Sequence, residues 1–332
     1  MGEKRFEIYA PVIIPTLCRF EHFKRCIDSL SRCTGAEYTD VYVGIDYPLK
    51  DEHWNGYLKI CDYIKKVSGF RNLIVLKREK NYGVSGNTKD LKEIVRRKSD
   101  RYIYSEDDNE FAPNFLEYMN EGLTRFKNEK KVIYICGARS DFGADFSLFV
   151  HDYEKNVFPA KDYNASGVGI WFDKSKPAIY TKTSVLDSWK LTYKAFQVGH
   201  SSAINRMLHQ LNKDTQLPDV CRRLDFVFND KYCIFPIVTK VRNWGYDGTG
   251  INSDNNPDLI RVQELDTMDS FKMDEIEIKE YQGIDEYVKK LYSESAKMRM
   301  IVMIKYLYYK LTKKNFENTS IYKQFIKPTT TA

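Results

Sequence analysis

The sequence predicts an α/β protein whose mainly parallel sheet is flanked by helices. Over about the first 130 residues, short apolar segments of strand length alternate with amphipathic segments of helical length, as in parallel strands joined by right-handed crossovers. Charged side chains follow several of the strand segments. Open α/β folds bind ligands at the carboxyl edge of the sheet, so the fold class already indicates where a site would lie.

The expected elements follow from these periods. After residue 137 the pattern is less regular, and a C-terminal helix is expected at about 284–312. The segment 232–241 is an apolar strand in which Pro236 suits an edge position better than a central one. We therefore expect a main domain at 1–265 and a C-terminal helical extension at 266–332. The other strands are expected at 8–14, 40–45, 72–76, 101–104, 131–136 and 166–171, and the other helices at 20–30, 53–67, 87–97 and 183–211.

Composition narrows the class of protein. The net charge of +6 permits an anionic ligand or a membrane surface but does not require nucleic acid. No run of about 18 apolar residues occurs, and the N-terminal apolar segment is too short for a signal peptide. The seven cysteines include no CxxC pair, and the five histidines form no zinc-like cluster. We therefore expect a cytoplasmic protein with reduced thiols.

One stretch, Arg101–Leu116, carries the strongest chemical signal. The strand pattern Tyr102–Tyr104 is followed by three adjacent acids, Glu106, Asp107 and Asp108. Adjacent carboxylates repel one another, and a bound cation explains them most simply. The alternative is an acidic loop before the next helix, whose N-terminus attracts negative charge.

Charged groups also follow the first two strands. Arg19 comes after the first strand and Asp46 after the second, so both would share one sheet edge with the acidic cluster. Arginine can pair with phosphate or with base edges, and Asp46 can accept a hydrogen bond from a base or a ribose. Asp108 can hold a divalent metal, Mn²⁺ or Mg²⁺, together with phosphate oxygens and waters. Taken together, these groups suit a nucleoside diphosphate; taken singly, each would be a solvated loop residue.

The glycine-containing loops match no common nucleotide motif. Neither GxxxxGK[ST] nor GxGxxG after a strand occurs, and the loop 81–87 is a weak phosphate cradle. The segment 245–250 has three glycines in six residues and is a candidate mobile lid, with an ordinary surface turn as the alternative. Aromatic residues near these loops, Trp171, Phe172 and Trp244, could stack on sugar rings or pack in the core.

Two longer segments resemble glycosyltransferases of the GT-A fold, a Rossmann-like architecture. They are YSEDDNEFAPNFLEYM at 104–119 and CIFPIVTKVRNWGYDGTGIN at 233–252, within a likeness that spans roughly residues 8–255. The sequence is similar to bacterial family-2-like transferases and to the eukaryotic N-acetylglucosaminyltransferase that starts complex N-glycans, which carries an acidic EDD motif. The second segment resembles the part of these enzymes that closes over the donor.

The resemblance implies a role for each candidate residue. Arg19 matches a nucleotide-contacting arginine, Asp46 a uracil- or ribose-contacting aspartate, and Asp108 the acid that usually touches the metal. A catalytic base is expected in the second half of the chain, with Asp225 as the first candidate and Asp247 as the second. The other residues expected to contact the nucleotide-sugar are Asn81, Glu106, Asp107, Trp244 and Gly248.

The implied activity is that of a metal-dependent, inverting glycosyltransferase. It would move a sugar from a nucleotide-sugar, with UDP-linked donors leading, to a hydroxyl of a growing cell-surface glycan. Two alternatives stay open. A sugar-nucleotide nucleotidyltransferase would carry a glycine-rich basic loop after the first strand, where this sequence has PTLCRFEH. A non-catalytic glycan-binding protein would not need the acidic cluster.

The C-terminal helix has an apolar face and many basic residues. A basic amphipathic helix of this kind, within 284–314, can lie on an anionic membrane surface at the inner face of the cell membrane. The alternative is that its apolar face packs on the catalytic domain. The residues that share the face on a helical wheel are Met300, Ile301, Met303, Ile304, Leu307, Tyr308 and Leu311.

Overall fold

The computed structural model describes residues 8–139, 146–211, 217–249 and 256–326. The chain forms two compact units, which we call the sheet unit and the helical unit. The sheet unit contains residues 1–160, 164–176 and 232–279, and the helical unit contains residues 161–163, 177–231 and 280–332.

This division differs from the expected boundary at 265/266. Residues 266–279 belong to the sheet unit, because the backbone of Phe271 and Met273 is held by side chains of a helix of that unit, Glu117 and Glu121. Residues 177–231 belong with the C-terminal helices, with which they share one apolar core.

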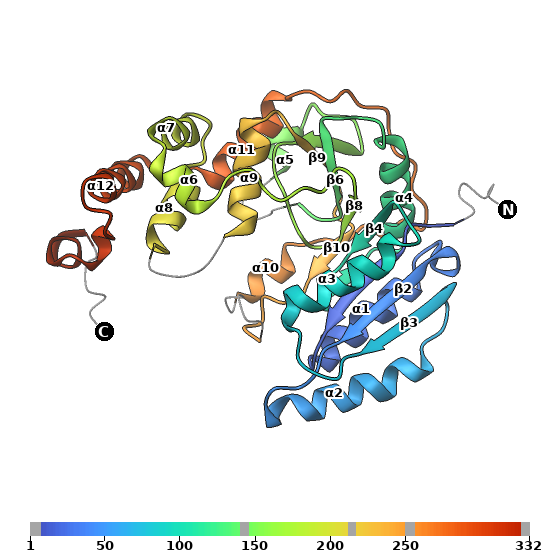
Figure 1. The fold of residues 1–332 in the computed structure, drawn as a ribbon. Helices are drawn as coiled ribbons and strands as arrows, with labels where there is room; N and C mark the ends of the chain where they lie inside the picture. The colour runs from blue at the N-terminus through green and yellow to red at the C-terminus, as the bar shows by residue number, and fades with distance from the viewer. Residues whose placement is uncertain (1–7, 140–145, 212–216, 250–255, 327–332) are drawn as a thin grey trace. The chain divides into compact units, whose positions relative to one another are not determined.

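The sheet unit is built on a mixed sheet that has eight strands within the described residues, in the order β3-β2-β1-β4-β8-β6-β9-β7 (Figure 1). β7 and β8 run antiparallel to their neighbours, and the other six strands run in one direction, so the predicted mainly parallel α/β sheet is confirmed. The strands are β1 (Val12–Thr16), β2 (Asp40–Ile45), β3 (Asn72–Lys77), β4 (Arg101–Tyr104), β6 (Val132–Cys136), β7 (Val157–Ala160), β8 (Val168–Trp171) and β9 (Tyr232–Pro236).

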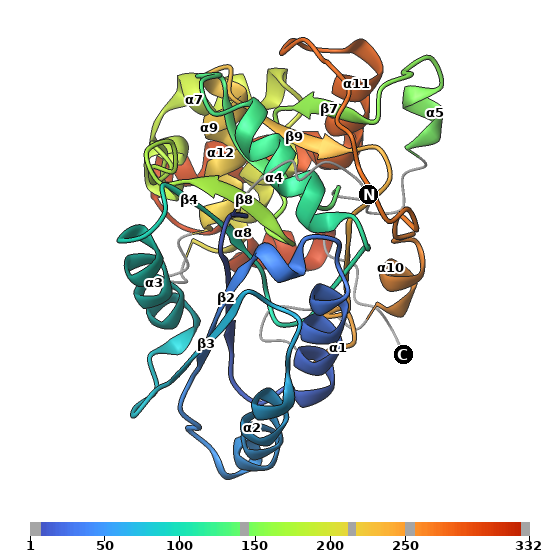
Figure 2. The same cartoon turned by 90° about the vertical axis from the view of Figure 1, so that its right-hand side faces the viewer.

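Helices cover both faces of this sheet. Val12 and Ile14 of β1 belong to the same apolar core as Phe23 and Leu30 of α1, whereas Ile13 is buried outside that core, as expected for alternating strand side chains. Figure 2 shows α1 on one side of β2 and β3 and α3 on the other. The helices of this unit are α1 (Phe20–Ser31), α2 (Asp51–Tyr63), α3 (Gly83–Arg96), α4 (Phe115–Arg125), α5 (Ser147–Val150) and α10 (Pro257–Arg261), with 3₁₀ turns at Ala36–Tyr38 and Ile64–Lys66.

The expectation for the strand at 232–241 was wrong in one respect. β9 is an interior strand, parallel to β6 and antiparallel to β7, rather than an edge strand. It tolerates Pro236 because this residue is the last of the strand, and the chain then leaves the sheet.

A second, two-stranded sheet was not expected from the sequence. β5 (Asn109–Phe111) directly follows the acidic cluster and pairs antiparallel with β10 (Val241–Asn243). This pairing joins segments about 130 residues apart and brings the loop after Asn243 to the acidic cluster.

The helical unit has its own apolar core. The segment expected as one helix at 183–211 forms three helices, α6, α7 and α8, and the expected C-terminal helix is interrupted at Ser293–Ser295. Among the described residues, no helix is long and apolar enough to cross a membrane. The helices are α6 (Lys182–Asp187), α7 (Trp189–Gln197), α8 (Ser201–His209), α9 (Pro218–Phe228), α11 (Gln282–Tyr292) and α12 (Ala296–Thr312), followed by short turns at Phe316–Asn318 and Tyr322–Ile326.

Candidate functional site

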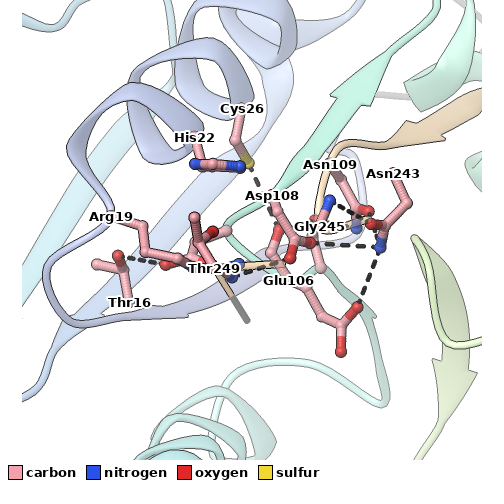
Figure 3. A network of polar contacts seen from close by, with 12 residues as sticks. Thr16, Arg19, His22, Cys26, Glu106, Asp108, Asn109, Asn243, Gly245 and Thr249 are labelled. Carbon is pink, nitrogen blue, oxygen red and sulfur yellow. Dashed lines mark hydrogen bonds and ion pairs between the residues drawn. The ribbon is translucent and has the colours of Figure 1, made fainter. Parts of the chain in front are cut away.

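The ends of β1 and β4 bring an arginine and two carboxylates together. These strands are parallel neighbours, so the residues that follow them meet at one edge of the sheet. The Arg19 guanidinium lies between the two carboxylates, with Nη2 bonded to Asp107 and 2.9 Å from Oδ2 of Asp108 (Figure 3). Thr16 of β1 donates a hydrogen bond of 2.7 Å to the other oxygen of Asp107.

This cluster has more negative charge than one guanidinium can balance. Both aspartates are buried. Burial raises the pKa of Asp108 above its usual value, Arg19 opposes this rise, and the charge of Asp107 adds to it. Burial alone would lower the pKa of Arg19, but the two aspartates raise it. Nη1 of Arg19 is buried and has no hydrogen-bond partner among the residues that the structure describes, so the cluster retains an unused donor there.

The loop that follows β10 lies against the acidic cluster. The Asn243 side-chain amide is 3.4 Å from Asp108 and 3.5 Å from Glu106, which are long contacts. The backbone N–H of Trp244 donates to the carbonyl of Asp108 at 2.8 Å. A Cβ atom at Gly245 would lie 2.5 Å from Oδ2 of Asp108, so glycine at this position leaves space beside that carboxylate.

The same loop carries three more residues singled out in the sequence. The guanidinium of Arg25 lies 4.0 Å from the centre of the Trp244 ring, and the indole N–H donates to Glu110 at 2.8 Å. Gly248 has φ +80°, which favours glycine. Gly250, the end of the candidate lid, lies outside the described residues.

Asp247 of this loop faces a histidine of α1. Its Oδ2 is 3.1 Å from Nε2 of His22, and its Oδ1 accepts hydrogen bonds from the backbone and side chain of Thr249. Burial alone would raise the pKa of Asp247, but the Thr249 hydrogen bonds and the charges of His22 and Arg19 hold that pKa below its usual value. This carboxylate is therefore ionised near neutral pH.

Asp46 and Asn81 lie together at the ends of β2 and β3. Oδ1 of Asp46 accepts from the backbone N–H groups of Tyr47 and Tyr82, at 2.9 and 2.8 Å. Asn81 donates to the carbonyl of Tyr47. Arg78, which directly follows β3, bonds to Asn87 and Asp90, while its Nη2 is buried without a hydrogen-bond partner.

Asp225 lies in the helical unit, inside α9 rather than at a helix start. Its Oδ1 accepts from Asn229 at 2.7 Å and its Oδ2 from Lys231 at 3.1 Å, so both oxygens are engaged. Arg223 of the same helix pairs with Asp162 at 2.9 Å. Of the other two aromatic candidates, Trp171 packs in the core and donates to the carbonyl of Leu123, and the ring of Phe172 lies 4.7 Å from that of Tyr102.

A metal site made wholly by the protein is not seen in the part of the chain that the structure describes, where no three His, Cys, Asp or Glu residues could hold one ion. The residues present do fit a metal ion that is held partly by protein carboxylates and partly by the oxygens of a bound diphosphate. Asp108 is a buried carboxylate with space beside it at Gly245. The carboxylates of Asp108 and Glu106 both contact the side-chain amide of Asn243. Mg²⁺ is commonly held by one or two carboxylates plus phosphate oxygens and waters.

Sequence reasoning missed three residues of this edge: His22, Arg78 and Asn243. His22 is the third residue of α1, and Arg78 directly follows β3. A charged residue at a strand end was the available signal for Arg78, whereas His22 had no signal of this kind. Asn243 had no such signal, because the β5–β10 pairing that places it was not predicted.

No protein-family model matches the sequence, and no curated protein matches it. Similar solved structures include the mannosyltransferase PcManGT from Pyrobaculum calidifontis in complex with GDP-Man and Mn²⁺, at 8% identity and a TM-score of 0.38, over 67% of this chain and 70% of that chain. A structure of S. aureus TarS residues 1–349 with UDP has 16% identity and a TM-score of 0.26, over 45% of this chain and 34% of that one. Another TarS structure has 12% identity and a TM-score of 0.30, over 70% and 36%. The chain thus spans about a third of the length of the TarS structures.

Proposed function

We propose that this protein is a metal-dependent, inverting glycosyltransferase that uses a nucleotide-sugar donor. One observation carries the proposal: Arg19, Asp107 and Asp108 converge at the carboxyl edge of a parallel sheet. The mainly parallel sheet flanked by helices is consistent with the GT-A-like fold that the sequence resemblance implies. Ligands of open α/β sheets bind at this edge.

The edge offers complementary groups for the parts of a nucleoside diphosphate. Asp46 and Asn81 would contact the base or ribose, together with the free Nη2 of Arg78. Arg19 has an unused N–H donor for a phosphate oxygen. Trp244 and Gly248 belong to the loop that would cover the donor, with one face of the indole already occupied by Arg25.

Asp108, with Glu106 and Asp107 beside it, would hold a Mn²⁺ or Mg²⁺ ion against the diphosphate. A bound divalent ion would neutralise the negative charge that develops on the leaving nucleoside diphosphate. The excess negative charge of the cluster supports this role, because one arginine, Arg19, faces two carboxylates. The raised pKa of Asp108 shows that its buried negative charge is not fully compensated. Asp108 would be ionised when a cation is bound.

Transfer requires a base that takes the proton of the acceptor hydroxyl. The acceptor oxygen then forms its bond to the anomeric carbon as the bond to the diphosphate breaks, which inverts the configuration. Asp225 and Asp247 are the candidates. Both carboxylates have both oxygens engaged, but the Asp247 side chain is 35% exposed and in the sheet unit, whereas that of Asp225 is 7% exposed and in the helical unit. Greater access to a hydroxyl favours Asp247.

The donor is proposed to be a UDP-linked hexose or N-acetylhexosamine. The acceptor is proposed to be a hydroxyl of a growing cell-surface glycan, which a lipid can carry, on the cytoplasmic side of the membrane. These assignments rest on the sequence resemblance rather than on a contact of the site.

A donor screen tests the proposal. Purified protein is incubated with UDP-linked and GDP-linked sugars, with Mn²⁺, with Mg²⁺ or with excess EDTA, and release of the nucleoside diphosphate is measured. We expect hydrolysis of at least one donor that requires metal. Release that is unaffected by EDTA would contradict the metal role, and release of pyrophosphate from a nucleoside triphosphate and a sugar phosphate would indicate a nucleotidyltransferase instead.

A further inference from the structure

Helix α12 packs on the helical unit through a face that the sequence does not single out. Val302, Tyr306 and Tyr309 are buried and belong to the core of this unit. Lys305 is buried with them, and its ammonium group donates to Asn205 at 2.9 Å and pairs with Glu317 at 2.5 Å. The helix is therefore anchored by a face that is opposite to its most apolar one.

This packing leaves a row of large apolar side chains exposed to solvent. The spacing of four, three and four residues puts them on one side of the helix. The residues are Met300, Ile304, Leu307 and Leu311, which are 69%, 46%, 45% and 87% exposed. We call them the α12 stripe. Single exposed apolar residues are ordinary, but a continuous row on one helix indicates a surface that contacts something else.

The charges around the stripe indicate what it contacts. From Ala296 to Asn315 the sequence contains six basic residues and no aspartate or glutamate, although Lys305 pairs with Glu317 and Lys313 with Asp187. Lys297, Arg299 and Lys314 are exposed. A protein partner would need an acidic, apolar groove, whereas an anionic bilayer offers both an apolar interior and a negative surface to any such helix.

We infer that the α12 stripe binds the surface of an anionic lipid bilayer, with its apolar side chains in the acyl boundary and its basic residues at the headgroups. The inference goes beyond the proposed reaction and does not depend on it, because lipid binding can be measured without donor or acceptor. Truncation from Ile284 is unsuitable as a test, since it would remove Tyr287, Val302 and Tyr306 from the core.

Vesicle flotation of the full chain tests the inference. The vesicles are phosphatidylcholine alone, or phosphatidylcholine in which about a third of the lipid is phosphatidylglycerol. The wild type should float with the anionic vesicles only. Leu307→Gln with Leu311→Gln should lower the partition coefficient at least about tenfold, because two leucines that would enter the acyl boundary are lost. The matched control, Leu58→Gln with Leu148→Gln, removes two leucines that are 54% and 66% exposed in the sheet unit and should float like the wild type.

A second variant separates charge from apolar burial. Lys297→Gln, Arg299→Gln and Lys314→Gln together should weaken binding to anionic vesicles by about fivefold for each charge removed, and should weaken its dependence on salt. Circular dichroism and thermal melting show whether each variant is folded.

Three results would overturn the inference. The first is a folded stripe variant that floats as well as the wild type, and the second is a wild type that floats with neither vesicle. The third is a wild type that elutes as a dimer, does not bind vesicles, and becomes monomeric in the stripe variant. That third outcome would identify the stripe as an interface between copies of this chain.

Discussion

Two buried arginine–carboxylate clusters, one in each unit, differ in how completely their charges are matched. At the sheet edge, Arg19 pairs with two carboxylates, and its buried Nη1 has no hydrogen-bond partner among the described residues. In the helical unit, Arg223 serves one carboxylate, Asp162, at 2.9 Å. Asp162 also accepts hydrogen bonds from the hydroxyl of Tyr292 and the backbone of Tyr163, and Arg223 donates to the Tyr163 carbonyl.

The difference distinguishes a cluster that has groups left for a ligand from a cluster whose charges are matched. A matched ion pair with its hydrogen bonds satisfied has nothing left to bind, and removing one partner exposes the buried charge of the other. An unmatched cluster has excess charge and an unused donor, which a cation and an anionic ligand together could satisfy. The sequence does not distinguish the two clusters, because in each of them the arginine and its aspartate partner are far apart along the chain.

The largest expected effect is loss of activity in Asp108→Asn. Transfer or donor hydrolysis should fall by at least about a thousandfold, because a metal ligand is removed. Without metal, the melting temperature should stay the same or rise, because one of two adjacent like charges is gone. The rates and the melting curves are compared with those of a control variant, Asp152→Asn, which changes an aspartate whose side chain is 89% exposed. Full activity in Asp108→Asn would remove the distinction between the two clusters.

The two arginines should differ in stability and in response to metal. Arg223→Met should lower the free energy of unfolding by about 3–5 kcal/mol, because the buried Asp162 is left unpaired. Arg19→Met also leaves buried carboxylates unpaired, but a divalent ion can replace the lost charge. Mn²⁺ should therefore raise the melting temperature of Arg19→Met by more than that of Arg223→Met, in which the sheet edge is intact. A response of Arg19→Met no larger than that of Arg223→Met would mean that the ion does not replace the charge of Arg19.

A buried histidine beside the Arg223–Asp162 pair, His200, should make the helical unit sensitive to acid. Burial lowers the pKa of His200, which is stacked on Tyr292, from its usual 6.5 to about 4; Asp162 opposes this shift and Arg223 adds to it. Between these two values the unfolded chain binds a proton that the folded chain does not, so stability is lost as the pH falls from 6.5 to 4. The loss from this group is at most about 3 kcal/mol.

His200→Phe keeps an aromatic ring on Tyr292 and removes the titration. Urea unfolding at a series of pH values should show that this variant loses about 3 kcal/mol less than the wild type on acidification. Parallel curves for the two proteins would mean that His200 is protonated in the folded state as readily as in the unfolded chain.

The smallest expected effect concerns the base, and it again compares the two units. Asp247→Asn should lower transfer by at least about a hundredfold while donor affinity stays near that of the wild type, as for the loss of a general base. Asp225→Asn should instead lower the free energy of unfolding by about 1 kcal/mol, because it weakens the contacts with Asn229 and Lys231. The reverse pattern, with transfer lost only in Asp225→Asn, would return the base to the helical unit.

The sequence alone determined the mainly parallel character of the sheet and the edge at which Arg19, Asp46 and Asp108 lie. Apolar strands alternating with amphipathic helices dictate parallel crossovers, and the carboxyl ends of parallel strands must share one edge. Arg19, Asp46 and Asp108 each follow a strand, so their place at that edge needed no knowledge of packing. Local sequence was sufficient because each of these residues is positioned by the element directly before it.

Only the tertiary structure decided which groups meet. The partners of Arg19 lie 88 and 89 residues away, and Asn243 reaches the acidic cluster only through the β5–β10 pairing. Contacts of this kind depend on chain segments that no local period relates. The same holds for α12: it has apolar residues on most sides, so the pattern does not specify one buried face. Packing of Val302, Tyr306 and Tyr309 into the helical unit chose the face, and that choice left the α12 stripe in solvent.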